Sequence, residues 1–384
     1  MNFEFATAAR IIFGHHAIKK VGPIVSDMGH RVLVVRGRTP ERAGLLVEDL
    51  KAQGLKTFFF SVAGEPTVDT VLEGVEQARQ AMTDLVVGIG GGSVLDTGKA
   101  IAALLTNRGS LLDYLETIGR GKQIRQAPVP YIAIPTTAGT GAEVTHNAVI
   151  GSPEHGVKVS MRSPLMLPRI ALIDPRLTLS MPPSLTAFTG LDALTQLMEA
   201  FVSNKANPLT DGICREGMQR AARSLPKAFQ NGKDLAARED MAIASLFGGM
   251  ALANAKLGAV HGFAGPLGGM FSAPHGAICG RLLCHVMEAN VHALNTRAPD
   301  SPALGRYEEV AQILTGVPTA RVVDGVTWVH DLCEIFEIPP LSAYHLKKED
   351  FPDVVMNVRK ASSTKGNPII LTDDELTRIL ENVF

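Results

Sequence analysis

The sequence predicts an α/β domain with a parallel sheet, followed by an all-helical domain. Short β-branched runs alternate with helical stretches over the first half, and long Ala- and Leu-rich stretches follow from Met181. The 384 residues also exceed the roughly 250–300 at which a single hydrophobic core stops growing. We therefore expect two domains, residues 1–180 and residues 181–384.

Short apolar runs in the first half are each followed by turn residues, as is typical of buried strands. The predicted strands are residues 31–35, 56–60, 85–89, 131–134 and 170–173. The predicted helices between them are residues 40–53, 67–82 and 93–105. This alternation predicts a parallel sheet with helices on both faces. Residues 144–150 and 157–161 predict a hairpin across the turn 151–156.

The second half changes character and predicts long helices. Their ranges are residues 186–202, 208–230, 234–256 and 276–290. A glycine-rich stretch precedes the last of them, and we expect it to be rich in loops. Ligands bind at the carboxyl ends of parallel strands or at domain interfaces. We therefore expect the active site in a cleft between the two halves.

Composition excludes several classes of protein. The net charge is -1, from 37 basic and 38 acidic residues, so nothing suggests a nucleic-acid or anionic-membrane partner. No run approaches the roughly 20 apolar residues that span a bilayer, and the first residues lack a signal-peptide pattern. The four cysteines show no Cys-x-x-Cys spacing. We therefore expect neither disulfides nor a thiolate zinc site, and a cytoplasmic location.

A glycine cluster, Gly90, Gly91 and Gly92 with Ser93, joins a predicted strand to a predicted helix. Glycines let the backbone approach a phosphate, and the first N–H groups of the helix attract an anion. The spacing departs from both the G-x-G-x-x-G and the P-loop patterns. A structural turn with Ser93 as N-cap remains the alternative. Asp96 either contacts a cofactor or pairs with Lys99 at i+3.

A second polar turn follows the strand at residues 131–134. It carries Thr136, Thr137 and Thr140 beside two glycines. Such a loop can hydrogen-bond a pyrophosphate or a ribose, and the alternative is an ordinary polar loop.

Four side chains could surround a divalent ion. Asp192 and Gln196 share a helix face at i and i+4, and His261 and His275 lie 14 residues apart. Two imidazoles, a carboxylate and an amide oxygen leave a position open for substrate. The alternative is that the histidines are ordinary polar residues.

Taken together, these motifs resemble the iron-containing (group III) alcohol dehydrogenases. The matching segments occur in the family's order and span most of the chain: residues 90–99, 135–141, 189–193 and 260–276. The resemblance implies a dehydroquinate synthase-like architecture, with a nicotinamide dinucleotide-binding domain and a helical metal and substrate domain. It implies a homodimer that uses NAD or NADP and a small-molecule alcohol, aldehyde or ketone. Lys158 matches a family position near the cofactor.

Two positions depart from the family pattern. Gln196 stands where the family's metal set, an aspartate and three histidines, usually has its second histidine, and a neutral amide is a poorer ligand for late transition metals. Gly265 stands where a histidine often lies near the nicotinamide. Maleylacetate reductases resemble this family and work without a metal, so a metal-independent reductase is the alternative function. In that case His261 and His275 would act as hydrogen-bond donors or general acids.

The end of the first predicted strand bears on the choice of cofactor. NAD-preferring members place an acid at the position of Gly37, which Arg36 and Arg38 flank here. Because arginine pairs with a 2′-phosphate, we expect NADP, with Gly37 and Arg38 at the ribose; two solvated arginines are the alternative. A divalent iron or zinc ion would act as a Lewis acid. A dehydroquinate synthase-type lyase and a nonenzymatic nucleotide-binding protein are the remaining alternatives.

Overall fold

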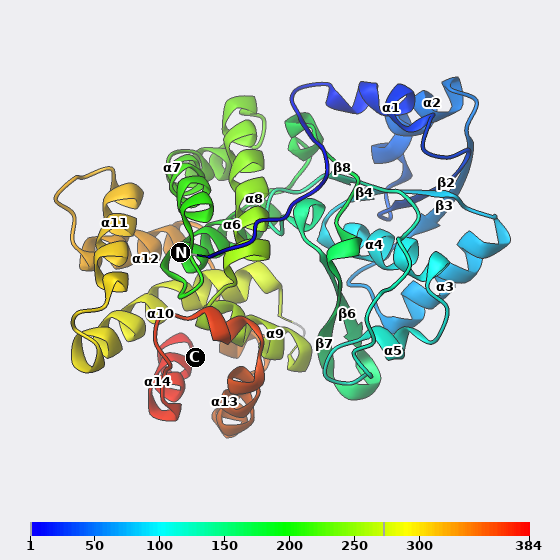
Figure 1. Ribbon diagram of the computed structural model, residues 1–384. Coiled ribbons are helices and arrows are strands. Elements are labelled where there is room, and N and C mark those ends of the chain that lie inside the picture. Colours follow the sequence, from blue (N-terminus) through cyan, green and yellow to red (C-terminus); the bar gives the residue numbers. More distant parts are fainter. Residues whose placement is uncertain (1, 272) are drawn as a thin grey trace. The chain divides into compact units, whose positions relative to one another are not determined.

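The computed structural model describes residues 2–271 and 273–384, and the chain forms two compact units. The first unit, Ala6–Ser180, is called the α/β unit here. The second, called the helical unit, is Met181–Phe384 with the N-terminal segment that ends at Phe5. Among the described residues, every strand lies in the α/β unit (Figure 1). The predicted fold class is confirmed.

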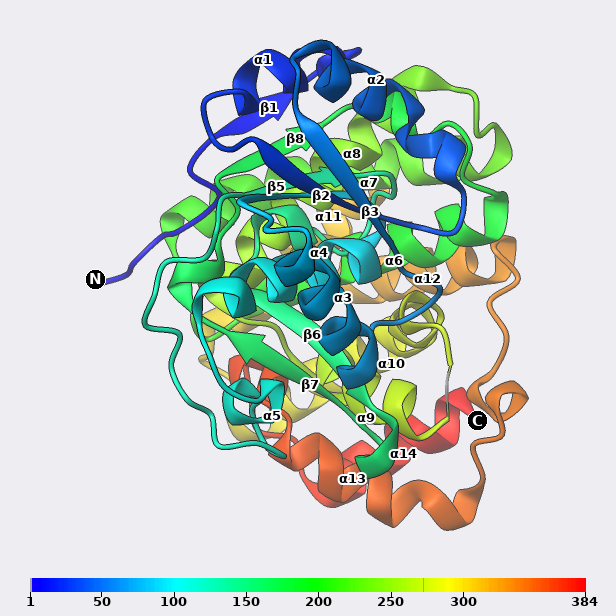
Figure 2. The ribbon, with the colours of Figure 1, turned by 90° about the vertical axis from the view of Figure 1, so that its right-hand side faces the viewer.

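Six parallel strands form the sheet of the α/β unit (Figure 2). They are β1 (Ile11–Phe13), β2 (Arg31–Arg36), β3 (Lys56–Ser61), β4 (Leu85–Gly90), β5 (Tyr131–Pro135) and β8 (Ile170–Ile173). Their order is β1-β8-β5-β4-β2-β3, with every neighbouring pair parallel. All five predicted strands are present, within one residue at each end. Strand β1 was not predicted, because its three residues are too few to show a periodicity.

Alternate residues of each strand enter two separate cores. Val32 and Val34 point to the face covered by α1 (Val21–Val25) and α2 (Gly44–Ala52). Leu33 and Val35 point to the opposite face. That face is covered by α3 (Val68–Gln80), α4 (Gly92–Thr106) and the short helix α5 (Leu111–Tyr114). Helices on both faces explain why these strands are almost continuously apolar.

An antiparallel hairpin packs on the α4 side of the sheet. Its strands are β6 (Asn147–Ser152) and β7 (Val157–Arg162), and Ala148, Ile150 and Met161 are fully buried. The first strand begins at Asn147 and not at residue 144, as predicted. The reason is local, because residues 142–144 form a 3-10 turn after Gly141, whose φ of 60° is left-handed.

Nine helices make up the described part of the helical unit. They are α6 (Pro183–Val202), α7 (Pro208–Gln230), α8 (Leu235–Ala255), α9 (Ala259–Met270), α10 (His275–Arg297), α11 (Pro302–Thr315), α12 (Val322–Ile335), α13 (Phe351–Lys360) and α14 (Asp373–Val383). Helix α6 packs against α7, α8 and α10, so it is buried on nearly every side. This explains its apolar sequence and makes Asp192, Gln196 and Glu199 interior side chains.

The expectation of a loop-rich stretch before α10 was wrong, because residues 259–270 form helix α9. Val260, Phe263, Ala264 and Leu267 are buried at the i, i+3, i+4, i+7 spacing of an amphipathic helix. Several glycines and Pro266 hide this pattern in the sequence. Tertiary packing of the apolar face outweighs their low helix propensity.

No single helix among the described residues is long and apolar enough to cross a bilayer. Helices α8 and α9 pass that test of length and composition only as a pair, and they are bent by 101° at the break between them.

Candidate active site

The carboxyl ends of three neighbouring strands bring the predicted cofactor residues together. Arg36 of β2 is paired with Ile89 of β4, and Gly90 of β4 is paired with Pro135 of β5. The turns that follow these strands therefore lie at one edge of the sheet. We call this region the glycine edge; its residues are Gly37, Arg38, Gly90, Gly91, Gly92, Ser93, Thr136, Thr137 and Thr140. Helix α2, after β2, and helix α4, after β4, cover opposite faces of the sheet, the arrangement at which α/β sheets bind nucleotides.

Two turns of the glycine edge pack closely against each other. The N–H of Thr136 donates to the carbonyl of Gly90 at 2.9 Å. A Cβ on Gly91 would lie 3.3 Å from Cγ2 of Thr137, and one on Gly92 would lie 2.8 Å from Cγ2 of Thr140. A side chain at position 92 would force Thr140 to shift and one at position 91 would be tight, and helix α4 begins directly beside the threonines. The edge therefore fits a pyrophosphate, which would accept hydrogen bonds from backbone N–H groups and hydroxyls.

Asp96 and Lys99 fix the loop behind this edge. The buried Nζ of Lys99 donates to the carbonyls of Ala142 and Asn147 at 2.9 and 2.6 Å and to Oγ1 of Thr145 at 3.0 Å. It also lies 3.5 Å from a carboxylate oxygen of Asp96. Asp96 in turn accepts from the N–H of Val149 at 2.9 Å. The i, i+3 pair is therefore formed, and it joins α4 to the hairpin.

Lys158 lies on β7 and reaches the same edge of the sheet. Its Nζ forms an ion pair of 2.5 Å with Glu65, which lies in the turn after β3. The backbone N–H of Gly151, which pairs with Lys158, donates to the carbonyl of Pro66 in that turn at 2.8 Å. The hairpin is thus anchored beside the carboxyl end of the sheet.

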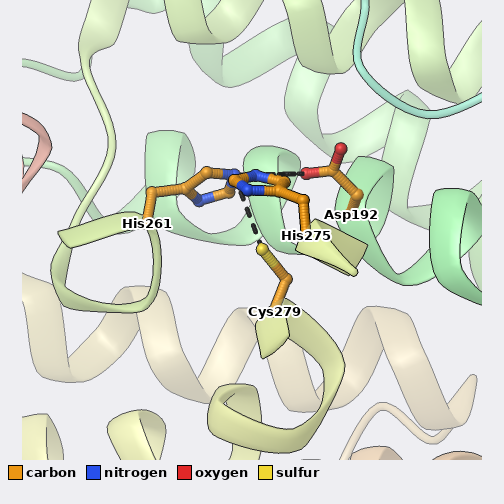
Figure 3. Close-up of side chains that lie close together, drawn as sticks. All are labelled: Asp192, His261, His275 and Cys279. Carbon is orange, nitrogen blue, oxygen red and sulfur yellow. Dashed lines mark hydrogen bonds and ion pairs between the residues drawn. The ribbon is translucent and has the colours of Figure 1, made fainter. Parts of the chain in front are cut away.

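Four ligand atoms converge in the helical unit (Figure 3). Oδ1 of Asp192, Nε2 of His261, Nε2 of His275 and Sγ of Cys279 form what we call the Asp–His cluster. These side chains offer one ligand atom each, all within 4.8 Å of one another. Asp192 lies 3.2 Å from His261 and 3.7 Å from His275, and the thiol lies 3.9 Å from His261. The side chain of His275 is 39% exposed, so the cluster is open to solvent on that side.

Glu199 positions the imidazole ring of His261 from the side opposite Asp192. Its carboxylate accepts from the N–H of Val260 at 2.7 Å and lies 2.7 Å from Nδ1 of His261. A proton on Nδ1, donated to Glu199, leaves the lone pair of Nε2 of His261 available to a metal ion at the centre of the cluster. This carboxylate–histidine pair is the arrangement that orients histidine ligands in metalloproteins.

Charges in the Asp–His cluster depend on one another. Burial lowers the pKa of His261 and His275, but the neighbouring thiol of Cys279 and the carboxylate of Asp192 raise it by more. Burial raises the pKa of Asp192 and Cys279, but the facing imidazoles lower it by more. The acidic groups thus favour their charged forms and draw protons onto the imidazoles. A divalent cation would displace those protons, so the donor set fits a metal.

Gln196 and Cys279 both lie beside the predicted ligands. Gln196, one turn after Asp192, donates from its amide nitrogen to Oδ1 of Asp192 at 3.1 Å. Cys279 lies one turn after His275, and cysteine–cysteine spacing alone gave no reason to expect it at a metal site. The His275–Cys279 spacing at i and i+4 was the available signal. Gly265, one turn after His261, has open space where a Cβ would stand.

Comparison with known families identifies the whole chain. A profile described as "Iron-containing alcohol dehydrogenase" matches residues 8–175, and one described as "Fe-containing alcohol dehydrogenase family, C-terminal" matches residues 186–384. The chain belongs to the iron-containing alcohol dehydrogenase family. It is therefore an oxidoreductase that acts on alcohols, and neither a lyase nor a nonenzymatic binding protein.

Individual relatives agree along nearly their full length. Alcohol dehydrogenase 4 of Saccharomyces cerevisiae (strain YJM789) is 34% identical over 363 residues, covering 94% of this chain and 90% of the yeast protein. A crystal structure of 1,3-propanediol oxidoreductase aligns with a TM-score of 0.92 at 31% identity, covering 100% of both chains. Sulfoacetaldehyde reductase from Bifidobacterium kashiwanohense, in complex with NAD+, aligns with a TM-score of 0.88 at 30% identity, covering 100% of this chain and 99% of that one. Members of this family use NAD or NADP and a metal.

Proposed function

We propose that this enzyme is a metal-assisted dehydrogenase that interconverts a small alcohol and its aldehyde or ketone with NADP(H). The observation that carries the proposal is the Asp–His cluster. Asp192 and His261 are buried, His275 is half-exposed beside them, and their ligand atoms converge on one point. A buried carboxylate facing two imidazoles is a ligand set for a divalent transition metal.

Some side chains of the site would bind the metal ion, and one orients a ligand. Asp192, His261 and His275 would hold the ion, while Glu199 fixes the ring of His261 through its Nδ1. Bound there, a divalent iron or zinc ion supplies Lewis-acid polarisation of the alcohol or carbonyl oxygen. The exposed side of His275 is where a substrate oxygen would approach. On the side away from His275, the buried side chains of His261 and Gln196 would exclude water.

The glycine edge would hold the cofactor. The start of α4 and the threonine turn bind the pyrophosphate, while Asp96 and Lys158 anchor the hairpin beside it. The nicotinamide supplies the hydride acceptor and donor. The chain's own task is to orient the ring toward the carbinol carbon.

Elemental analysis of protein purified without chelator tests the metal. We expect about one iron or zinc ion per chain, and aldehyde-dependent NADPH oxidation that chelation abolishes and added metal restores. Activity that survives complete removal of metal would instead support the metal-independent reductase of the maleylacetate reductase type. The replacement of a histidine by Gln196 is the observation that favours that second candidate.

The end of β2 supports the preference for NADP. Arg38 is exposed, the guanidinium of Arg36 lies 4.8 Å from the ring centroid of Phe59, and a Cβ on Gly37 would meet no atom within 4 Å. A 2′-phosphate would thus meet positive charge, at a position where NAD-preferring members carry an acid. We expect a higher kcat/KM with NADPH than with NADH, and Gly37→Asp reverses that ratio without a steric clash. An unchanged ratio in Gly37→Asp would refute this role. The homodimer and the cytoplasmic location are further proposals that rest on family membership and composition.

A further inference from the structure

The Asp–His cluster contains one ligand, Cys279, that the family pattern does not supply. Cys279 is fully buried on α10, and it follows His275 by one turn, so both side chains lie on the same face of the helix. Figure 3 shows its sulfur pointing toward the two imidazole rings, which the carboxylate of Asp192 also faces, and a contact of 3.9 Å joins the sulfur to His261. The sulfur and the three other ligand atoms lie within 4.8 Å of one another.

Distances within the cluster match those around a tetrahedral ion. Zinc bonds of about 2.0–2.3 Å to oxygen, nitrogen and sulfur place neighbouring ligand atoms about 3.3–3.7 Å apart. The observed separations are 3.2 Å for Asp192–His261, 3.7 Å for Asp192–His275 and 3.9 Å for Cys279–His261. The remaining separations are within 4.8 Å, so movements of up to about 1 Å would complete the coordination.

Gln196 is engaged differently. Its amide nitrogen donates to Oδ1 of Asp192 at 3.1 Å, so this side chain braces the carboxylate from the outside. A ligating amide would have to present its oxygen, which is neutral and hard, whereas a thiolate is charged and suits zinc. One carboxylate and one thiolate also balance the charge of a divalent ion, which matters in a buried site.

We propose that Cys279 is the fourth protein ligand, replacing the family histidine whose position Gln196 occupies, and that the site is built for zinc. This inference rests on the proposed function, since it concerns the same metal. The site would have the ligand set Asp192, His261, His275 and Cys279, with Gln196 as a positioning residue. The substrate oxygen would enter as a fifth ligand, a number that catalytic zinc accommodates.

Cobalt substitution of the full-length protein tests the sulfur ligand directly. The metal-free enzyme binds one Co²⁺ per chain, and we expect an intense near-ultraviolet thiolate-to-cobalt charge-transfer band. Cys279→Ser loses that band while still binding cobalt more weakly. Cys284→Ser is the matched control, because Cys284 is buried on the same helix outside the cluster, and it keeps the band. Adding Gln196→His to Cys279→Ser restores affinity without restoring the band.

X-ray absorption at the zinc edge of the unmodified enzyme gives the same answer without a variant. We expect one sulfur neighbour at about 2.3 Å, beside oxygen and nitrogen neighbours at about 2.0–2.2 Å. Bound metal with only oxygen and nitrogen neighbours would overturn the assignment of Cys279 and leave the proposed function intact. Absence of any bound metal, with activity that survives chelation, would overturn both.

Discussion

The glycine edge and the Asp–His cluster are built in opposite ways. The first consists of backbone and small side chains, and its main parts follow strands β4 and β5 directly. The second consists of the side chains of ligand-type residues on α6, α9 and α10, and its first and last members, Asp192 and Cys279, are 87 residues apart. A backbone site tolerates few substitutions, because any Cβ on Gly92 would clash. A side-chain site can exchange one ligand for another while its geometry is kept.

The largest expected effect comes from Asp192→Asn, which removes the negative charge at the centre of the Asp–His cluster. Oδ1 of Asp192 is contacted by His261, His275 and Gln196, so its charge holds the cluster together. We expect loss of bound metal and a fall in kcat/KM of more than about 100-fold, beyond the 10–100-fold cost typical of outer-shell changes. Metal analysis and steady-state kinetics measure this. NADPH affinity should stay unchanged, and a parallel loss of it would show that the two regions are not independent.

Glu199→Gln sharpens the comparison, because Glu199 both orients His261 and caps α9. We expect metal affinity to fall about 10–100-fold, measured by competition with a chelator. The melting temperature should also fall, since the carboxylate accepts from the N–H of Val260. A lower melting temperature with unchanged metal affinity would show that Glu199 only caps helix α9 and does not orient a metal ligand.

Gly92→Ala tests whether close backbone packing at the glycine edge is needed for cofactor binding. The added Cβ would lie 2.8 Å from Cγ2 of Thr140, so the turn must shift, at a cost of about 1–3 kcal/mol. We expect the KM for NADPH to rise about tenfold, with metal content unchanged. Gly44→Ala is the matched control, because a Cβ there meets no atom within 4 Å. A double-mutant cycle with Thr140→Ala should show coupling, and strict additivity would contradict the packing argument.

The smallest expected effect is on stability and concerns Glu143, behind the glycine edge. Burial raises the pKa of this carboxyl from 4.5 to about 7. The folded state therefore holds a proton that the unfolded state has released, so stability falls as pH rises from about 4.5 to about 7. Glu143→Gln should remove this slope, which urea unfolding at several pH values measures. If the free energies of unfolding of the two proteins differed by the same amount at every pH from about 4.5 to about 7, Glu143 would not titrate in this way.

Sequence periodicity predicted the strands of the α/β unit well, because neighbouring residues of each strand enter opposite cores. Alternating valines and leucines specify strands with two covered faces, and turn glycines mark where each strand ends. Helix α9 was missed because its glycines and Pro266 obscure its periodicity and because its cap comes from elsewhere. Glu199 accepts from the N–H of Val260, 61 positions away, and Asn367 accepts from the N–H of Ala259. No local pattern encodes such a partner.

The candidate site shows the same division. The glycine and threonine turns could be identified from short motifs, and the structure brings them together at one edge. Asp192, His261 and His275 were found through their order along the chain. Cys279 and Glu199 were not, because the first was judged only by its spacing from other cysteines and not from His275, and the second acts only through His261.

The pairing of β1 with β8 has a consequence for the order of assembly. Residues 11–13 bind residues 171–173, so the earliest strand of the sheet finds its partner last. During synthesis at about 5–20 residues per second, β1 must wait several seconds or more for β8 to appear. The strands β2, β3, β4 and β5 can associate while it waits. A ribosome-bound nascent chain should therefore show a nearly complete sheet whose first strand remains open to proteases until β8 emerges.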